Sequence, residues 1–174
     1  MPKRHLVLVG LMGAGKTTVG KRCAEQLGRP FVDTDELVVS VAGIPFDELW
    51  AAEGEAGFRA RERVAVADAA ASPAPLVIAC GGGAVLDPAS RRELRASGFV
   101  VWLDADAAVL ASRLEGDDSR PLLAGGDRAT TLTRLGHTRA PAYEAAADVT
   151  IETDGRSVEE VAQRVLEEFQ SCNV

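Results

Sequence analysis

A glycine-rich loop directly after an apolar run constrains the fold of this chain most strongly. The run Leu6–Val9 leads into Gly10-Leu-Met-Gly-Ala-Gly-Lys-Thr17, which fits the pattern of a phosphate-binding loop. Such a loop joins a strand to a helix. Its glycines let backbone N–H groups converge on phosphate oxygens, and the helix adds its positive N-terminal end. The sequence therefore predicts a nucleoside triphosphate site in an α/β fold.

Each position of this loop has an expected task. Lys16 is expected to reach the β- and γ-phosphates, and the Thr17 hydroxyl to bind Mg²⁺. The residues of the loop expected to bind ATP are Gly13, Ala14, Gly15, Lys16, Thr17 and Thr18.

Four further apolar runs are expected to form strands: Phe31–Val32, Leu76–Cys80, Phe99–Leu103 and Val149–Ile151. They are short, mostly non-alternating and separated by helical segments, which is typical of a parallel sheet covered on both faces. We therefore expect residues 1–174 to form a single α/β domain. Its fold would be that of a P-loop NTPase, with a five-stranded parallel sheet flanked by helices.

Two pairs of residues mark helix ends. Asp87-Pro88 is typical of a helix start, and Gly98 is expected to end that helix. Ser157 and Glu160 have the spacing of a capping box before an amphipathic C-terminal helix. These signals predict packing elements and carry no function by themselves.

Composition narrows the class of partner. The 174 residues carry a formal net charge of −7, which argues against a general nucleic-acid binder, because such a protein needs a basic face. No apolar run approaches about 18 residues, so we expect no membrane contact and a cytoplasmic protein. The three cysteines, Cys23, Cys80 and Cys172, have no metal-binding spacing and indicate neither a disulfide framework nor a zinc site.

A carboxylate is expected near the metal, and the sequence offers two regions for it. Asp33 ends the second predicted strand, where ligands bind in such folds. Asp104 also follows a strand, but Asp104 and Asp106 precede a helical run and are explained by N-capping. Asp33 is the better candidate, and a turn or cap role remains its alternative.

Two segments break the alternation of strands and helices. Residues 35–63 carry an additional helical stretch, longer than a simple crossover requires, and we expect a substrate-binding insertion there. Residues 115–128 are polar and rich in Gly and Asp. This segment is either a surface loop or a mobile lid with glycine hinges that keeps water from the triphosphate.

The residues that would hold a phosphate acceptor favour a small-molecule kinase. A guanine-reading Asn-Lys-x-Asp motif is impossible, because the chain has a single Asn, Asn173. Asp35, two residues after Asp33 on the same side of an expected extended segment, is placed to orient an acceptor hydroxyl. The isolated arginines suit bidentate capture of a carboxylate or phosphate, although each alone could be a solvated surface charge. These arginines are Arg59, Arg120 and Arg139.

Three consecutive glycines follow the third predicted strand. They let the backbone approach a ligand closely, and a tight turn with positive φ would require one or two of them. They are Gly81, Gly82 and Gly83.

Together these motifs resemble the shikimate kinase family in order and in spacing over essentially the whole chain. The phosphate loop alone is shared by many kinases, whereas the combination is far more specific. The motifs are the loop, Asp33-Thr34-Asp35, GEAGFRARE at residues 54–62, Gly81–Gly83, Arg120-Pro-Leu-Leu and Arg139-Ala-Pro-Ala-Tyr143.

The resemblance implies ATP-dependent phosphorylation of the 3-hydroxyl of shikimate, a step toward chorismate and the aromatic amino acids. By carry-over, Arg59 and Arg139 bind the shikimate carboxylate, while Asp35 and the Gly82 region contact its hydroxyls. Lys16, Asp35 and the lid residue Arg120 would be catalytic.

The resemblance also implies that Asp33 serves Mg²⁺ through water, that Glu62 holds Arg59, and that Arg113 and Arg156 lie near adenine. Arg113 and Arg156 are equally well explained as surface charges. Trp50 and Phe58 would wall the pocket or form plain core, and Trp50 replaces another large apolar residue.

Three questions stay open at this level. Asp35 either removes the proton or only aligns the hydroxyl. A kinase of another hydroxy acid such as gluconate is the nearest rival, and a catalytically silent ATP-binding module is the rival from another class. We expect a monomer, since nothing in the sequence resembles an obligate interface.

Overall fold

The computed structural model describes residues 4–172, and its five strands form one parallel sheet in the order β2-β3-β1-β4-β5. The strands are β1 (His5–Val9), β2 (Phe31–Asp33), β3 (Val77–Ala79), β4 (Gly98–Asp104) and β5 (Val149–Glu152). Every residue of the central strand β1 is buried, which explains why Leu6–Val9 are apolar without alternation. The predicted five-stranded parallel sheet is confirmed.

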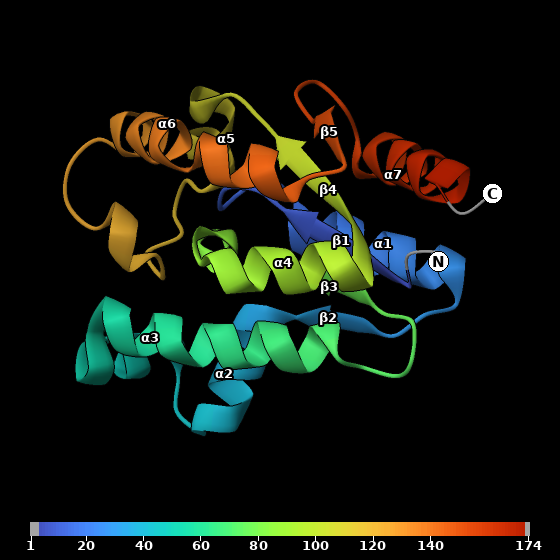
Figure 1. Cartoon of the computed structure of the whole chain (residues 1–174). Helices are drawn as coiled ribbons and strands as arrows, with labels where there is room; N and C mark the ends of the chain where they lie inside the picture. The colour runs from blue at the N-terminus through green and yellow to red at the C-terminus, as the bar shows by residue number, and fades with distance from the viewer. Residues whose placement is uncertain (1–3, 173–174) are drawn as a thin grey trace.

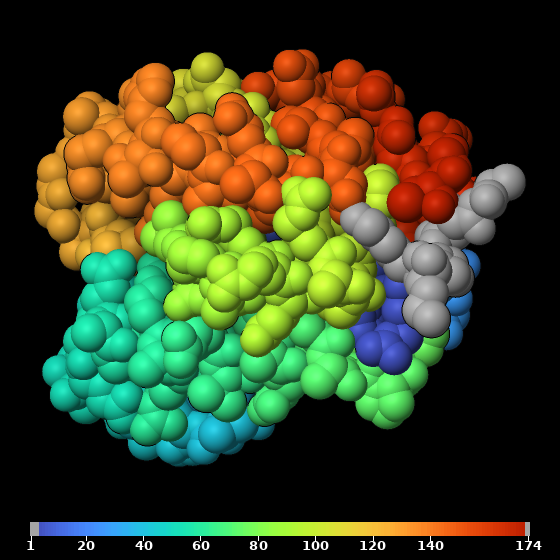
Figure 2. All heavy atoms as spheres, viewed as in Figure 1, coloured from blue at the N-terminus to red at the C-terminus, as the bar shows by residue number. Residues whose placement is uncertain are grey.

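Helices cover both faces of this sheet, with α4 in front of it and α1 behind it in Figure 1. α1 packs against α7, whereas α4 contacts α3, β4 and α6. Figure 2 shows α6, α4 and α3 as successive bands across one face of the molecule. The helices are α1 (Lys16–Leu27), α2 (Thr34–Ala42), α3 (Phe46–Ala70), α4 (Pro88–Ser97), α5 (Ala107–Arg113), α6 (Arg128–Ala146) and α7 (Val158–Cys172), with short 3₁₀ helices η1 (Ala84–Leu86) and η2 (Pro121–Leu123).

The predicted helix ends are present. The Asp87 side chain accepts hydrogen bonds from the N–H groups of Ala89 and Ser90 at the start of α4, and Gly98 ends this helix. Before α7, Ser157 N donates to Glu160 Oε2 at 2.8 Å and Glu160 N donates to Ser157 Oγ at 3.2 Å. The reciprocal bonds are those of a capping box.

Helix α3 is broken near its N-terminal end. Gly54 has φ 67° and ψ −173°, values that lie outside the helical region and favour glycine. On either side of the break, Phe46 stacks on Trp50 and meets Phe58 edge to face, and all three ring centroids lie 5.0 to 5.6 Å apart. These rings form a small apolar cluster of their own beside α2, separate from the main core.

Two local expectations were wrong. Asp35 does not follow Asp33 on an extended segment, because α2 begins at Thr34 and places Asp35 in its first turn. The cap before α5 is Asp106, whose side chain accepts from Ala108 N, whereas Asp104 is the last residue of β4. Burial raises the pKa of Asp104, and the nearby carboxylates of Asp154 and Glu152 raise it further.

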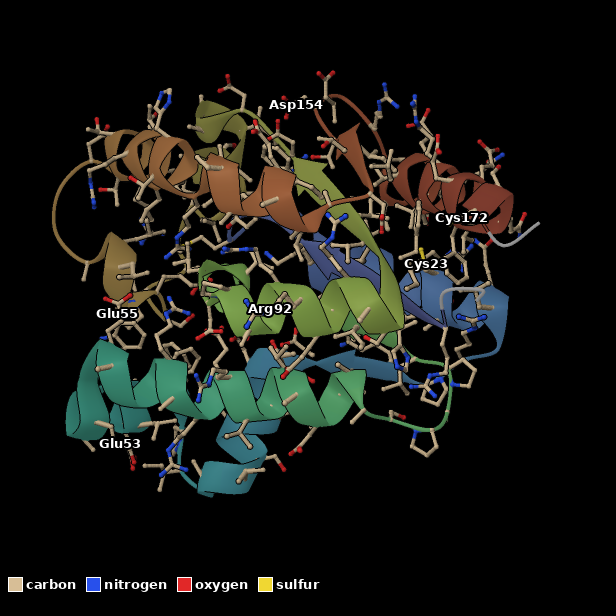
Figure 3. All side chains as sticks on the ribbon, viewed as in Figure 1. Cys23, Glu53, Glu55, Arg92, Asp154 and Cys172 are labelled. Atoms are coloured by element: carbon tan, nitrogen blue, oxygen red, sulfur yellow. The ribbon has the colours of Figure 1, made fainter. Side chains whose placement is uncertain are left out.

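The cysteines form no disulfide: Cys23 and Cys80 are buried and Cys172 is exposed. Cys23 points from α1 toward α7, where its Sγ lies 3.8 Å from the Ala162 carbonyl oxygen (Figure 3). Among residues 4–172, no helix combines the length and the apolar character that crossing a membrane requires.

Candidate active site

The loop after β1 has the geometry of an anion cradle at the N-terminus of α1. Gly13 and Gly15 adopt φ values of 82° and 93°, which a residue with a side chain rarely adopts. Lys16 Nζ donates to the carbonyl oxygens of Gly10 and Leu11 at 2.7 and 2.8 Å. The loop therefore binds its own lysine and holds the ammonium group over the cradle.

The carboxylate of Asp33 has two tasks at once. Its Oδ1 accepts from Asp35 N at 2.9 Å and from Glu36 N, and so caps α2. Its Oδ2 accepts from the Thr17 hydroxyl at 2.8 Å. The helix-cap reading of Asp33 is correct, and it leaves the second oxygen beside Thr17.

A cavity of about 840 Å³ extends from this loop across the carboxyl ends of the strands. Its lining includes the loop residues 13–18, together with predicted ATP-binding residues from distant parts of the chain. These are Arg113, Arg120 and Arg156. Arg113 Nη1 donates to the Gly13 carbonyl and to Thr153 Oγ1, both at 3.2 Å, so it joins the loop to the end of β5.

A smaller hollow of about 50 Å³ adjoins this cavity. It is lined by α3 residues Phe46, Trp50, Phe58, Arg59 and Glu62, and by Arg139 of α6. Asp35, Gly82 and Arg120 line both the cavity and the hollow. Met12 and Phe46 line both as well, so a group that occupied the hollow would meet the cavity at these five residues.

Polar atoms around the hollow are buried and lack partners. Among the described residues, the buried side-chain atoms without a hydrogen-bond partner include Asp35 Oδ1, Glu62 Oε1 and Arg139 Nη1. Leaving such atoms unpaired is costly, and polar atoms of this kind in native proteins generally find a partner. Arg139 is only 3% exposed, so this charged donor in particular calls for a ligand or water.

The three glycines after β3 bring the backbone between these side chains. A Cβ on Gly81 would lie 2.4 Å from Asp35 Oδ1 and from Glu62 Oε1, and one on Gly83 would lie 2.4 Å from the Arg59 guanidinium. None of the three has positive φ, so the expected turn is not the reason for them. The requirement is steric: any larger residue would enter the space of the charged side chains.

Neighbouring residues fix this backbone. Tyr143 Oη donates to the Gly82 carbonyl at 2.6 Å, and Gly81 N donates to Thr34 Oγ1 at 2.9 Å. Sequence reasoning missed both roles, although Tyr143 and Thr34 stand inside the motifs that it used. The motifs drew attention to charge and not to the hydroxyls that hold the glycines.

Arg59 is held by acidic side chains on its own helix. Its Nη1 lies 2.7 Å from Glu62 Oε2 and its Nη2 lies 3.5 Å from Glu55 Oε1. The predicted contact with Glu62 is confirmed. Figure 3 shows Glu55 at the end of α3 that faces η2.

Burial shifts the pKa values of the charged groups at the junction. It lowers the pKa of Lys16 to about 8, although the Asp35 carboxylate opposes this shift. Burial raises the pKa of Asp35. The Asp33 carboxylate adds to this effect, and the Lys16 ammonium opposes it. Burial also raises the pKa of Glu62, against the effect of Arg59. A buried base and a buried cation thus lie in one site, where perturbed titration is typical of function.

All predicted site residues therefore line the cavity or the hollow. The acceptor set is Asp35, Arg59, Gly81, Gly82, Gly83 and Arg139; the metal set is Thr17 and Asp33. Sequence reasoning did not include Met12 and Leu122, which also line the hollow. Their apolar side chains carried no signal that distinguished them from core.

Comparison with known proteins identifies the family. A sequence model of the shikimate kinase family matches residues 12–170. The chain is 51% identical to a shikimate kinase of Symbiobacterium thermophilum over 168 residues, which cover 95% of this chain and 96% of that protein.

Two solved structures show the same likeness. The shikimate kinase from Acinetobacter baumannii in complex with shikimate has a TM-score of 0.93 and 38% identity, covering 97% of this chain and 93% of that one. The shikimate kinase from Bacteroides thetaiotaomicron has a TM-score of 0.85 and 32% identity, covering 95% and 98%. The family model and these identities, over nearly full lengths, lead to one conclusion: the chain belongs to the shikimate kinase family.

Proposed function

We propose that this protein transfers the γ-phosphoryl group of ATP to the 3-hydroxyl of shikimate. The products are shikimate 3-phosphate and ADP, on the route to chorismate and aromatic amino acids. One observation carries the proposal: a hollow with an unpaired buried arginine nitrogen, Arg139 Nη1, and an unpaired buried carboxylate oxygen opens onto a phosphate cradle. A hydroxylated carboxylic acid has the complementary groups.

The acceptor is bound by its two kinds of polar group. Arg139, with Arg59 beside it, takes the carboxylate, since a planar guanidinium suits bidentate binding of this anion. Asp35 accepts a hydrogen bond from the reacting hydroxyl, and the Gly81–Gly83 backbone contacts the ring hydroxyls. Trp50 and Phe58 wall the apolar side of the ring. Residues 35–63 thus serve as the substrate-binding region.

The nucleotide is bound by the loop and by arginines. Backbone groups of residues 13–18 hold the phosphates, and Arg113 and Arg156 lie toward the adenine. Thr17 and Asp33 supply hard oxygen donors of the kind that Mg²⁺ prefers, with Asp33 acting through water. Bound there with ATP, Mg²⁺ would neutralise charge on the phosphates.

Phosphoryl transfer needs positioning and charge stabilisation more than a strong base. Lys16 lies over the cradle, and Arg120 lines both the cavity and the hollow, so the two cations flank the transferred group. The raised pKa of Asp35 makes it a better proton acceptor than an exposed aspartate. Orientation of the hydroxyl by Asp35 is the minimum that the reaction requires.

The remaining proposals concern the setting of the enzyme. Residues 115–128 act as a lid over the phosphates, with glycines at positions 116, 125 and 126 whose φ is positive. The protein works as a cytoplasmic monomer that binds neither nucleic acid nor membrane. Its net charge of −7 makes the gathering of basic side chains in the site a local feature that draws anionic ligands.

The test is ADP release from MgATP with shikimate, with gluconate and with no acceptor, followed by ³¹P NMR of the product. We expect release that depends on shikimate and a phosphate on its 3-hydroxyl. Release that depends on gluconate would contradict the acceptor assignment. Nucleotide binding without release for any acceptor would contradict the enzyme assignment.

A further inference from the structure

Arg128 stands at the first position of α6, where its charge does not help the helix. The N-terminal end of a helix is positive, so an arginine there is unfavourable. Asp127 already caps this end by accepting from Thr130 N at 2.9 Å. Capping of α6 therefore does not explain Arg128. Its side chain contacts the opposite end of the segment 115–128.

The guanidinium of Arg128 binds the beginning of that segment. Its Nη1 donates to the carbonyl oxygens of Leu114 and Asp117, the latter at 2.9 Å, and its Nη2 donates to Asp118 Oδ1 at 2.9 Å. The Asp118 side chain is 94% exposed, so this ion pair contributes little. The two carbonyl contacts are partly buried and join residues 11 to 14 positions apart in sequence.

Asp117, whose backbone Arg128 holds, in turn contacts Arg120. Asp117 Oδ2 lies 3.3 Å from Arg120 Nε, and Asp117 Oδ1 accepts from Ser119 N at 3.0 Å. The contact uses Nε and leaves the terminal N–H groups of Arg120 for a phosphate. Figure 1 shows this segment, with η2, as a coil set apart from the sheet and beside the end of α3. The regular part of this segment is the short η2, closed by the bond from Leu123 N to the Arg120 carbonyl at 3.0 Å.

We propose that Arg128 and Asp117 are positioning residues that hold Arg120 at the mouth of the active site. Arg128 fixes the backbone at Asp117, and the carboxylate of Asp117 orients the Arg120 guanidinium toward the nucleotide. The glycines of residues 115–128 then allow the middle of the segment to move, while the bonds from Arg128 hold its two ends together. This inference rests on the proposed function, in which Arg120 contacts the transferred phosphoryl group.

The first test measures hydrogen exchange of residues 115–127 in the nucleotide-free protein, which needs no activity. Arg128→Lys keeps the charge but replaces the planar fork with one nitrogen. We expect exchange in this segment to become faster by about tenfold, because two hydrogen bonds are weakened. Arg134→Lys, at an exposed position on the same helix, is the matched control and leaves the exchange unchanged. Unchanged exchange in Arg128→Lys would overturn the proposal.

The second test is a double-mutant cycle on kcat with Arg120→Ala. We expect Arg128→Lys alone to lower kcat by about tenfold, with a change of less than about twofold in KM for shikimate. In the Arg120→Ala background the same change should add less than about twofold, because Arg128 acts through Arg120. Asp117→Asn should behave in the same way with a smaller effect.

Independent, multiplying losses in the double variant would overturn the proposal. A wild-type protein inactive with shikimate would instead count against the proposed function. The exchange result would still test whether Arg128 holds the backbone at Asp117. Thermal unfolding of each variant separates a local change from a loss of the fold.

Discussion

The two sides of the site differ in how their polar groups are satisfied. On the nucleotide side, Lys16 and Thr17 have partners inside the chain, in loop carbonyls and in Asp33. On the acceptor side, Asp35, Glu62 and Arg139 each carry a buried atom with no partner in the part of the chain that the structure describes.

The difference follows from the chemistry of the two ligands. Phosphates are bound largely by backbone N–H groups, so a loop can be built in advance and held by its own side chains. A small hydroxy acid has to be surrounded by side chains, and we infer that the unpaired atoms among them find partners when the acid binds. We therefore expect a bound substrate to offset the unfavourable burial of these atoms on the acceptor side.

The largest effect on activity is expected on the nucleotide side of the site. Lys16→Ala should lower kcat by about a thousandfold, because a preorganised cation at the phosphates is lost. Binding of shikimate alone, measured by calorimetry, should change little. Lys21→Ala, an exposed residue on the same helix, is the control and should retain activity. An unchanged rate for Lys16→Ala would remove the phosphate-loop assignment.

The next largest effect is expected at Gly81 on the acceptor side. Its replacement by alanine would bring Cβ within 2.4 Å of Asp35 Oδ1 and Glu62 Oε1, so both side chains must move. We expect kcat/KM for shikimate to fall by about a hundredfold, since small misplacements of positioning groups are costly. Nucleotide affinity should be retained. An equal loss of affinity for shikimate and for nucleotide would contradict the proposed difference between the two sides of the site.

Gly136→Ala is the matched control for Gly81→Ala. Gly136 lies in the middle of α6, and a Cβ there would meet only Leu11 Cδ1 at 3.4 Å. Activity should survive, and stability should rise slightly because alanine is the better helix former.

Arg139→Lys tests the carboxylate assignment with a smaller change. A point charge replaces a bidentate fork, so the dissociation constant for shikimate should rise by about tenfold while that for ATP stays nearly constant. Arg134→Lys is the control on the same helix. Calorimetric titration of each ligand distinguishes the two cases, and comparable weakening of ATP would speak against a carboxylate clamp.

The smallest effect concerns a buried polar residue far from the acceptor, whose atoms are all paired. His5 Nδ1 accepts from Leu76 N at 3.0 Å, and Nε2 lies 3.2 Å from the Ala70 carbonyl. This pairing requires the neutral ring, and burial lowers the pKa of His5 below its ordinary 6.5, with Arg4 and Arg29 adding to the shift.

Because the pKa of His5 is lowered on folding, its contribution to stability is complete above pH 6.5 and declines as the pH falls below that value. Urea unfolding at several pH values should show this decline. His5→Gln should show a weaker decline over the same range, and an equal one would contradict the assignment. Replacing the exposed His137 in the same way is the control.

Much of the fold was predictable, because its signals are local. The run Leu6–Val9 and the loop after it fix β1 and the start of α1, and Asp87-Pro88 fixes the start of α4. The start of α2 was missed, because the cap of that helix, Asp33, also reads as the end of a strand. Asp33 both ends β2 and caps α2, and the sequence pattern alone does not separate these two roles.

The contacts around the three glycines could not be predicted from the sequence, although the residues of the acceptor side were. Asp35 and Glu62 approach Gly81, Arg59 approaches Gly83 and Arg139 approaches Gly82, and these side chains come from helices α2, α3 and α6. The hydroxyl bond from Tyr143 to Gly82 likewise spans 61 positions. Such contacts exist only once the chain has folded, and motif spacing indicates the residues without their roles.

The central claim is that the buried unpaired atoms of the acceptor side are completed by the substrate. A crystal structure of the protein with shikimate and ADP tests it most directly. We predict the shikimate carboxylate within hydrogen-bond distance of Arg139 Nη1 and a ring hydroxyl within the same distance of Asp35 Oδ1. Shikimate bound elsewhere, with both atoms paired only to water or left without a partner, would contradict the account.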